Sequence, residues 1–510
     1  MSVDTEVLRR LIAEREEKLA RLGREVDPYP RRFDRTHTSA TAKVEREALL
    51  ASGRVVRYAG RLMAKRGMGR TLFAPVDDEW GRLQVYFKRD DLGEDLFARV
   101  EKLLDIGDFI GVSGPLFVTR TGELTVQVQE FDLLAKALRP LPEKYHDLSL
   151  ELRSRRRYLD LAMNLESRAR FRRRSEIVRE IRRFLDEEGY LEVETPALQP
   201  LYGGATARPF VTHHHALDTT LFLRIADELY LKRCIVGGLD RVYEIAKDFR
   251  NEGMDRTHNP EFTMLECYAA YLDYHDMMDL TERLLRTLVG RFGEDGRVPY
   301  GEEVLDFSVP FGRVRFLEAL DARLGLSIRT LDDASLADLA RTHGIEVTGE
   351  MGRDRVLDEL FGLLVEPGLV QPTFVMDHPQ ELSPLAKAHR SEPGLVERFE
   401  LFACGFELAN SFTELNDPRE QRRRFEAQRA LAEAGDEEAQ QLDEDFLQAL
   451  EVGMPPTGGL GVGVDRLVML LTDSHSIRDV LLFPHLRPES RRERPGTGPA
   501  SSSAADGAPG

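Results

Sequence analysis

The alternation of apolar and polar positions divides the chain into a helical start, a strand-rich segment and a long mixed segment. Residues 1–48 space leucines among charges as a helix does, which predicts an amphipathic helical extension broken near Pro28 and Pro30. Residues 49–139 change to short alternating runs and predict about five strands with one helical insert. This pattern fits a five-stranded Greek-key barrel of the oligonucleotide-binding (OB) type, although other small barrels share it.

The mixed segment begins with a linker over residues 140–165 and continues as a second domain over residues 166–488. The run RFRRRSEIVREIRRFLDEEGY predicts a long amphipathic helix that ends near Gly189. Strand and helix patterns alternate from there onward. Residues 489–510 are rich in Pro, Gly, Ser and Ala, a composition typical of a disordered tail. We therefore expect an α+β protein with an N-terminal OB-type barrel and a larger second domain.

Composition limits the classes of protein that the chain can belong to. With 510 residues, 42% hydrophobic and 31% charged, it can bury enough apolar surface for two or three domains. Its three cysteines are odd in number and far apart, which argues against a disulfide framework and a cysteine-based zinc site. We find no secretory signal and no apolar run of membrane-spanning length, so we expect a cytoplasmic protein without membrane association.

The charge of the chain leaves nucleic-acid binding undecided. The net charge is −18, whereas a nucleic-acid-binding domain normally carries a positive patch. Between Arg153 and Arg183, however, the sequence contains twelve arginines and only four acidic residues. A solvated helix face with ion pairs explains such a run about twice as often as a phosphate contact does.

Four blocks differ from ordinary core patterning. In RIADELYLKR, Glu228 is an isolated acid, and such a residue is more often an ion-pair residue than a ligand-binding one. In FRNEGMDRTHNPEFTMLECY, charged and polar residues crowd a loop between two apolar strands. Arginine can bind a carboxylate or phosphate there through two hydrogen bonds, and Phe262 can stack on a planar base. Glu266 and Tyr268 lie two residues apart and share one face of the second strand.

The third and fourth blocks suggest oxygen ligands and a close backbone approach. Glu400 and Glu407 lie in apolar strands and could hold magnesium, although strands whose acids face water are equally compatible. In GGLGVGVDRLVML the glycine spacing is a poor dinucleotide fingerprint. Glycines that let a ligand approach a strand, with Arg466 in the first turn of the following helix, explain the block better.

Together and in order, these blocks resemble bacterial class II lysyl-tRNA synthetases from about residue 55 to residue 488. RRFLDEEGYLEVETPAL is similar to class II motif 1, FRNEGMDRTHNPEF to motif 2 and GLGVGVDRLVML to motif 3. The segments LYGGATARPFVTHH, RIADELYLKR, SFTELNDP and DSHSIRDVLLFP are closer to the lysine enzymes than to their aspartate and asparagine relatives. The resemblance implies ATP-dependent activation of lysine and its transfer to tRNA(Lys) by a homodimer with an antiparallel catalytic sheet flanked by helices.

The resemblance also implies roles for individual residues. The α-amine of lysine would meet Gly204 and Glu228, and its carboxylate would meet Arg250. The side-chain ammonium would meet Glu266, Tyr268 and Glu414, in a pocket that also contains Asn410 and Phe412. These acids agree with the charge of the substrate, because a buried ammonium needs a nearby carboxylate to remain charged. The implied ATP-binding residues are Arg250, Glu252, His258, Asn259, Phe262, Glu407, Gly461 and Arg466.

Catalysis would depend on Arg250 and Arg466, and Glu400 and Glu407 would hold magnesium. The resemblance implies about three magnesium ions with ATP bound. In the barrel, Phe73 would stack on an anticodon base while Gln84 and Glu123 would bind base edges. The chain departs from many relatives at Cys267, Ala409 and Ser411, and we expect these residues to trim the lysine pocket.

Two alternatives share much of this pattern. A paralogue that lysylates a protein would use the same catalytic domain, but the paralogues of this kind lack the barrel. A catalytically silent nucleic-acid-binding protein on the same scaffold would have no need to keep Arg250, Arg466 and the two candidate magnesium ligands. Lysine-dependent exchange between ATP and pyrophosphate separates these possibilities.

Overall fold

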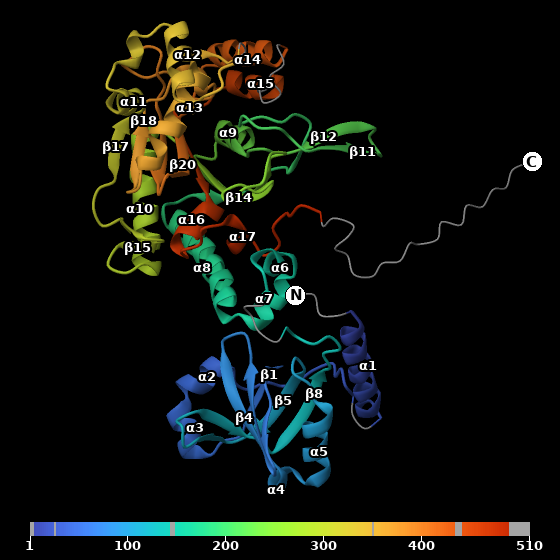
Figure 1. The fold of residues 1–510 in the computed structure, drawn as a ribbon. Helices are drawn as coiled ribbons and strands as arrows, with labels where there is room; N and C mark the ends of the chain where they lie inside the picture. Colours follow the sequence, from blue (N-terminus) through green and yellow to red (C-terminus); the bar gives the residue numbers. More distant parts are fainter. Residues whose placement is uncertain (1–4, 25–26, 143–147, 349–350, 434–440, 489–510) are drawn as a thin grey trace, which may run out of the picture. The chain divides into compact units, whose positions relative to one another are not determined.

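The computed structural model describes residues 5–24, 27–142, 148–348, 351–433 and 441–488 (Figure 1). The predicted tail therefore lies outside the described residues. Contacts among the described residues define two compact units, one within residues 5–168 together with 487–488 and one within residues 169–486. No helix in the described part of the chain is long and apolar enough to cross a membrane.

The first unit is built around one sheet of short strands. Its strands are β1 (Val56–Leu62), β2 (Arg66–Met68), β3 (Thr71–Asp77), β4 (Arg82–Lys88), β5 (Phe109–Gly114), β6 (Leu116–Val118), β7 (Leu124–Gln127) and β8 (Glu130–Ala135). They pair in the order β6-β7-β4-β3-β1-β5-β8, with β2 on β3. There are more strands than the five predicted segments because some segments are interrupted, one of them at Pro115. The predicted alternation is confirmed, since every second residue of β1 and β4 is buried.

Seven helices precede, interrupt or follow these strands in the sequence of the first unit as described. They are α1 (Thr5–Leu22), α2 (Ser39–Val44), α3 (Arg46–Ser52), α4 (Arg89–Leu92), α5 (Glu94–Leu103), α6 (Leu150–Arg155) and α7 (Arg157–Met163). The helical insert predicted between the strands is confirmed as α5, which buries Phe97, Val100 and Leu103 against the strands. A helix places such residues on one side at intervals of three.

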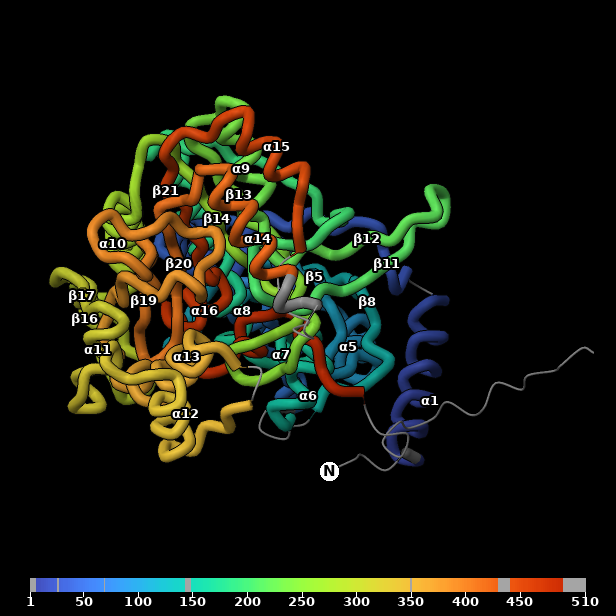
Figure 2. The backbone as a smooth tube through the Cα atoms, turned by 90° about the horizontal axis from the view of Figure 1, so that it is seen from above, coloured from blue at the N-terminus to red at the C-terminus, as the bar shows by residue number. Residues whose placement is uncertain are grey.

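The second unit has an antiparallel-rich sheet at its centre. The strands run in the order β17 (Gly312–Arg315), β18 (Thr373–Met376), β19 (Arg398–Ala403), β20 (Phe406–Thr413), β21 (Thr457–Gly463), β14 (Glu261–Ala270), β13 (Arg241–Phe249) and β9 (Leu191–Glu192). Small sheets are formed by β10 (Leu198–Gln199), β11 (Val211–His214) and β12 (Thr219–Leu223), and by β15 (Arg297–Tyr300) and β16 (Glu303–Asp306). The β11–β12 hairpin projects from this unit in both views (Figures 1 and 2).

Helices cover both faces of the central sheet. They are α8 (Leu165–Glu187), α9 (Glu228–Val236), α10 (Tyr274–Phe292), α11 (Phe316–Leu324), α12 (Asp333–Thr342), α13 (Arg353–Leu364), α14 (Pro418–Glu433), α15 (Glu444–Val452), α16 (Val464–Leu471) and α17 (Ile477–Val480). Helices α8, α10 and α16 share one apolar core with the sheet, and α9, α14 and α15 share another. The long helix predicted from the arginine-rich run is confirmed as α8.

Strand β14 shows how the sheet separates core from site. Leu265, Cys267 and Ala269 point into the core with α8, α10 and α16, whereas Glu266 and Tyr268 point to the opposite face. The expectation that Cys267 trims the lysine pocket is therefore wrong, because the register of the strand turns this side chain away. Ser411 is also absent from the cavity wall and donates to Gly459 O at 2.6 Å, whereas Ala409 does line the cavity.

Candidate active site

A cavity of about 410 Å³ lies on the face of the central sheet that carries Glu266 and Tyr268. Strands β14, β20 and β21 form its floor, and the loop between β13 and β14 forms part of its wall. The predicted lysine-binding and ATP-binding residues all line it except Glu414. The sheet thus brings together residues from distant parts of the sequence, from Gly204 to Arg466.

One end of the cavity is acidic. Tyr268 donates a hydrogen bond to Glu266 Oε2 at 3.0 Å. Burial, together with the nearby charges of Asp248 and Glu228, raises the pKa of Glu266 to about 8. Gly204, at φ +87°, lies very close to Ala226 and Glu228. A Cβ on Gly204 would lie 3.0 Å from Ala226 Cβ and 3.3 Å from Glu228 Cβ. This end can bind positively charged groups, and side chains larger than glycine would narrow it.

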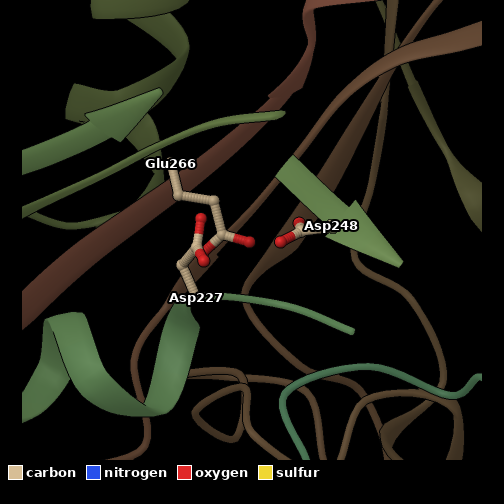
Figure 3. Close-up of side chains that lie close together, drawn as sticks. All are labelled: Asp227, Asp248 and Glu266. Carbon is tan, nitrogen blue, oxygen red and sulfur yellow. The ribbon is translucent and has the colours of Figure 1, made fainter. Parts of the chain in front are cut away.

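A second layer of carboxylates lies behind Glu266. Asp227, Asp248 and Glu266 each place an oxygen within 4.8 Å of the others, and the three side chains point toward one another (Figure 3). Arg224 lies 2.9 Å from Asp227 and 3.4 Å from Asp248. Sequence reasoning missed Arg224, Asp227 and Asp248, because their proximity depends on the packing of β13 and β14 against the start of α9. Glu266 is the member of this cluster that lines the cavity, where it can meet an ammonium group.

Glu414 is not one of the residues that line the cavity. It follows β20 directly, is fully buried, and pairs with the ammonium group of Lys232, which also pairs with Glu228. Burial disfavours the charge on Lys232, but the two carboxylates outweigh it and raise the pKa of Lys232. Sequence reasoning missed Lys232, although its spacing of four from Glu228 on a helix was a usable signal.

The loop between β13 and β14 supplies cationic and aromatic groups. The Arg250 guanidinium lies 5.1 Å from the centre of the Phe262 ring, and both side chains are half-buried. Arg250, Glu252, His258 and Asn259 all line the cavity. A guanidinium beside a ring can bind an anion while the ring stacks on a planar group.

Arg466 at the start of α16 reaches the same region. It donates to Glu407 O at 2.8 Å, and its guanidinium lies 3.0 Å from His258 Nε2. His258 Nδ1 is in turn 2.8 Å from Asp255 Oδ2. Gly461 lies across the strand pairings from both Glu266 and Asn410, and a Cβ there would approach Met264 Cε to 3.3 Å. Because Gly461 has no side chain, β21 leaves space for a ligand above the floor of the cavity.

Glu400 and Glu407 lie on the adjacent strands β19 and β20 and both line the cavity. Burial opposes the ionisation of Glu400, but Arg398 and His378 outweigh it and lower its pKa to about 2. Burial and the charge of Glu400 raise the pKa of Glu407. Glu400 is therefore ionised, and its charge disfavours the ionisation of Glu407. Two such carboxyl groups offer the oxygen ligands that a magnesium ion prefers, so they fit this metal. Sequence reasoning missed Arg398, which lies 2.5 Å from Glu400 Oε1.

In the first unit, Phe73 and Gln84 lie on the outer face of the sheet. The Phe73 ring is 4.5 Å from the Tyr86 ring, which is 5.7 Å from the Phe117 ring. Gln84 donates to Thr125 Oγ1 at 3.1 Å. Glu123 is exposed just before β7. Tyr86 and Phe117 were missed by sequence reasoning, although alternation within β4 already placed Tyr86 on the face of Gln84.

Comparison with known proteins adds the family. Residues 149–487 match the family described as tRNA synthetases class II (D, K and N), and residues 56–134 match the OB-fold nucleic acid binding domain. The chain belongs to the class II tRNA synthetases. The OB-fold and the catalytic domain predicted for this synthetase are confirmed.

Curated relatives narrow the family further. The lysine–tRNA ligase of Roseiflexus castenholzii is 53% identical over 480 residues, which cover 93% of this synthetase and 98% of the relative. The lysine–tRNA ligase of Staphylococcus saprophyticus is 51% identical over 473 residues, 91% of this synthetase and 95% of the relative. The lysine–tRNA ligase of Enterococcus faecalis is 50% identical over 483 residues, which cover 93% of this synthetase and 96% of the relative. The synthetase is a member of the lysine–tRNA ligase family.

Proposed function

We propose that the synthetase activates L-lysine with ATP to form lysyl-adenylate and transfers the lysyl group to the 3′ end of tRNA(Lys). The observation that carries the choice of amino acid is the acidic end of the cavity, where Glu266 is supported by Tyr268 and a second layer of carboxylates. A pocket for an acidic or amide side chain would need cations or neutral donors there. The side-chain ammonium group of bound lysine lowers the pKa of Glu266 by charge attraction and so favours its ionised form.

The geometry supports a division of the cavity into a lysine part and an ATP part. We place the α-amine of lysine at Gly204 and Glu228, its carboxylate at Arg250 and its side chain along Asn410 and Phe412 toward Glu266 and Tyr268. ATP lies between Phe262 and Arg466, with Glu252, His258, Asn259, Glu407 and Gly461 around it. Glu414 lies next to the lysine part, against Gly459.

The reaction follows from positions and charges. The carboxylate oxygen of lysine attacks the α-phosphorus of ATP in line, a P–O bond to pyrophosphate breaks, and the mixed anhydride lysyl-adenylate forms. Arg250 and Arg466 stabilise the negative charge that develops on the phosphate oxygens, and the fixed positions of both substrates lower the entropic cost. Glu400 and Glu407 would hold magnesium, about three ions with ATP bound, which supplies charge neutralisation for the phosphates. A hydroxyl of the terminal adenosine then attacks the lysyl carbonyl carbon and AMP leaves.

The first unit supports tRNA as the acceptor. We propose that Phe73 stacks on an anticodon base and that Gln84 and Glu123 bind base edges, with Tyr86 and Phe117 extending the aromatic surface. We propose that residues 49–139 form the anticodon-binding domain, that residues 166–488 form the catalytic domain, and that the synthetase works as a cytoplasmic homodimer without membrane association.

Exchange of pyrophosphate into ATP tests the amino-acid assignment. With each of the twenty amino acids supplied separately, we expect lysine to support exchange far above the rest. Exchange with another amino acid at an equal rate, or none with lysine, would refute the proposal. Charging of purified tRNA(Lys) against tRNA of another specificity tests the acceptor.

A further inference from the structure

Lys232 is a buried cation beside the lysine pocket to which the proposed reaction assigns no role. It lies one helical turn after Glu228 on α9, and its side chain is fully buried. Its ammonium group pairs with Glu228 and with Glu414 and lies 6.0 Å from the centre of the Phe446 ring. A buried lysine loses hydration and side-chain freedom, so these partners must compensate for both.

Within the described part of the chain, Lys232 does not reach the cavity and contacts the site only through its two carboxyl partners. Neither Lys232 nor Glu414 lines the cavity, whereas Glu228 does. Glu414 Oε1 lies against Gly459, and a Cβ at that position would overlap it. Lys232 therefore joins Glu228, which lines the cavity, to the buried Glu414.

Lys232 supplies a cation among the carboxyl groups beside the pocket. Glu228, Glu266 and Glu414 each place a carboxyl group there, and the substrate brings two ammonium groups. The substrate carboxylate is balanced separately by Arg250. Without Lys232, the buried carboxyl groups of Glu228 and Glu414 would lose the cation that they share, and one of them would take up a proton or turn toward another cation.

We propose that Lys232 is a positioning residue that fixes the Glu228 carboxylate for the α-amine of the substrate. This inference rests on the proposed function, because it takes lysine as the amino acid activated. Lys232 acts through Glu228 and Glu414 and does not touch the substrate.

The test compares lysine and ATP dependence in Lys232→Met, Lys232→Ala and Lys232→Arg. In the exchange assay we expect Lys232→Met to raise the KM for lysine by about tenfold or more and to change the KM for ATP by less than about twofold. Lys247→Met is the matched control, because Lys247 is an exposed lysine on β13 whose ammonium lies 3.8 Å from Glu261. We expect this control to keep both values.

Chemical rescue separates positioning from a structural defect. Lys232→Ala leaves a space into which ethylammonium can bring the missing charge, so we expect millimolar ethylammonium to lower the KM for lysine again. Lys232→Arg should retain part of the affinity. The proposal is overturned if Lys232→Met keeps the wild-type KM for lysine, if both KM values rise together, or if ethylammonium has no effect on a folded Lys232→Ala protein. Failure of the proposed function would show differently, as absence of lysine-dependent exchange in the unaltered protein.

Discussion

Replacement of Gly459 by alanine tests the shape of the proposed lysine pocket at its most crowded point. Gly459 lies in β21 between Tyr268 of β14 and Phe412 of β20. An added Cβ would overlap Glu414 Oε1 and lie 2.5 Å from Tyr268 Cε1 and 2.8 Å from Tyr268 Cδ1. Neither neighbour can move freely, because Glu414 pairs with Lys232 and Tyr268 donates to Glu266.

The size of the effect follows from the cost of overpacking. One extra methyl group in a packed interior costs about 1–3 kcal/mol. If the pocket relieves the clash by moving Tyr268 and Glu414, this cost appears in lysine binding, where about 1.4 kcal/mol corresponds to a tenfold change. The KM for lysine should then rise by about fivefold to 140-fold. The KM for ATP should change little, since Phe262 and Arg466 lie elsewhere in the cavity.

The neighbouring glycine provides the control. A Cβ at Gly458 would lie 2.7 Å from Met277 Cγ, on the core side of the same strand, and would not meet Glu414 or Tyr268. We expect Gly458→Ala to lower the thermal midpoint of unfolding while the KM for lysine stays near the wild-type value. Pyrophosphate exchange measured against lysine and against ATP, with thermal unfolding of each variant, gives both numbers. Equal losses of lysine affinity in the two variants, or an unchanged lysine KM in Gly459→Ala, would refute the reasoning.

Four further outcomes are expected. Glu266→Gln should raise the KM for lysine by about tenfold or more and leave that for ATP nearly unchanged, and equal rises would contradict the role of Glu266. The raised pKa of Glu266, about 8, means that the folded protein binds a proton that the unfolded chain releases near its ordinary pKa. The free energy of unfolding should therefore fall between about pH 5 and pH 8, less steeply in Glu266→Gln, and chemical denaturation across this range measures the difference. Glu407→Gln should increase the magnesium concentration that gives half-maximal exchange, and an unchanged requirement would remove Glu407 from the metal site. Phe73→Ala should weaken tRNA charging by about 1–3 kcal/mol in binding while amino-acid-dependent exchange stays intact, and loss of exchange would show a general defect.

Local patterns in the sequence were sufficient for much of the fold. Alternation identified the strands around Phe73 and Gln84 and the two strands that frame the loop containing Arg250. The concentration of charged and aromatic residues in that loop predicted that the loop faces a cavity, and residues of the loop line one. These inferences succeeded because a strand has a fixed period of two and because polar groups in apolar surroundings require a partner.

Other features depended on contacts between distant segments. Cys267 was expected at the pocket, but the register of β14 places it in the core with α8, α10 and α16. No motif distinguished Asp227 and Asp248 from other acids of the chain, and yet both are buried behind Glu266. A strand pattern predicts the alternation of its faces but does not say which neighbour covers each face.

The sequence by itself determined the class of chemistry, because the motif residues and the acids expected around a lysine ammonium can be read as residue types. The tertiary structure decided how those acids are used. Glu266 lines the cavity, whereas Glu414 does not line it and pairs with Lys232. The physical reason is that the charge state of a buried carboxylate depends on its burial and on the nearest cation, and both are set by segments far apart in the chain.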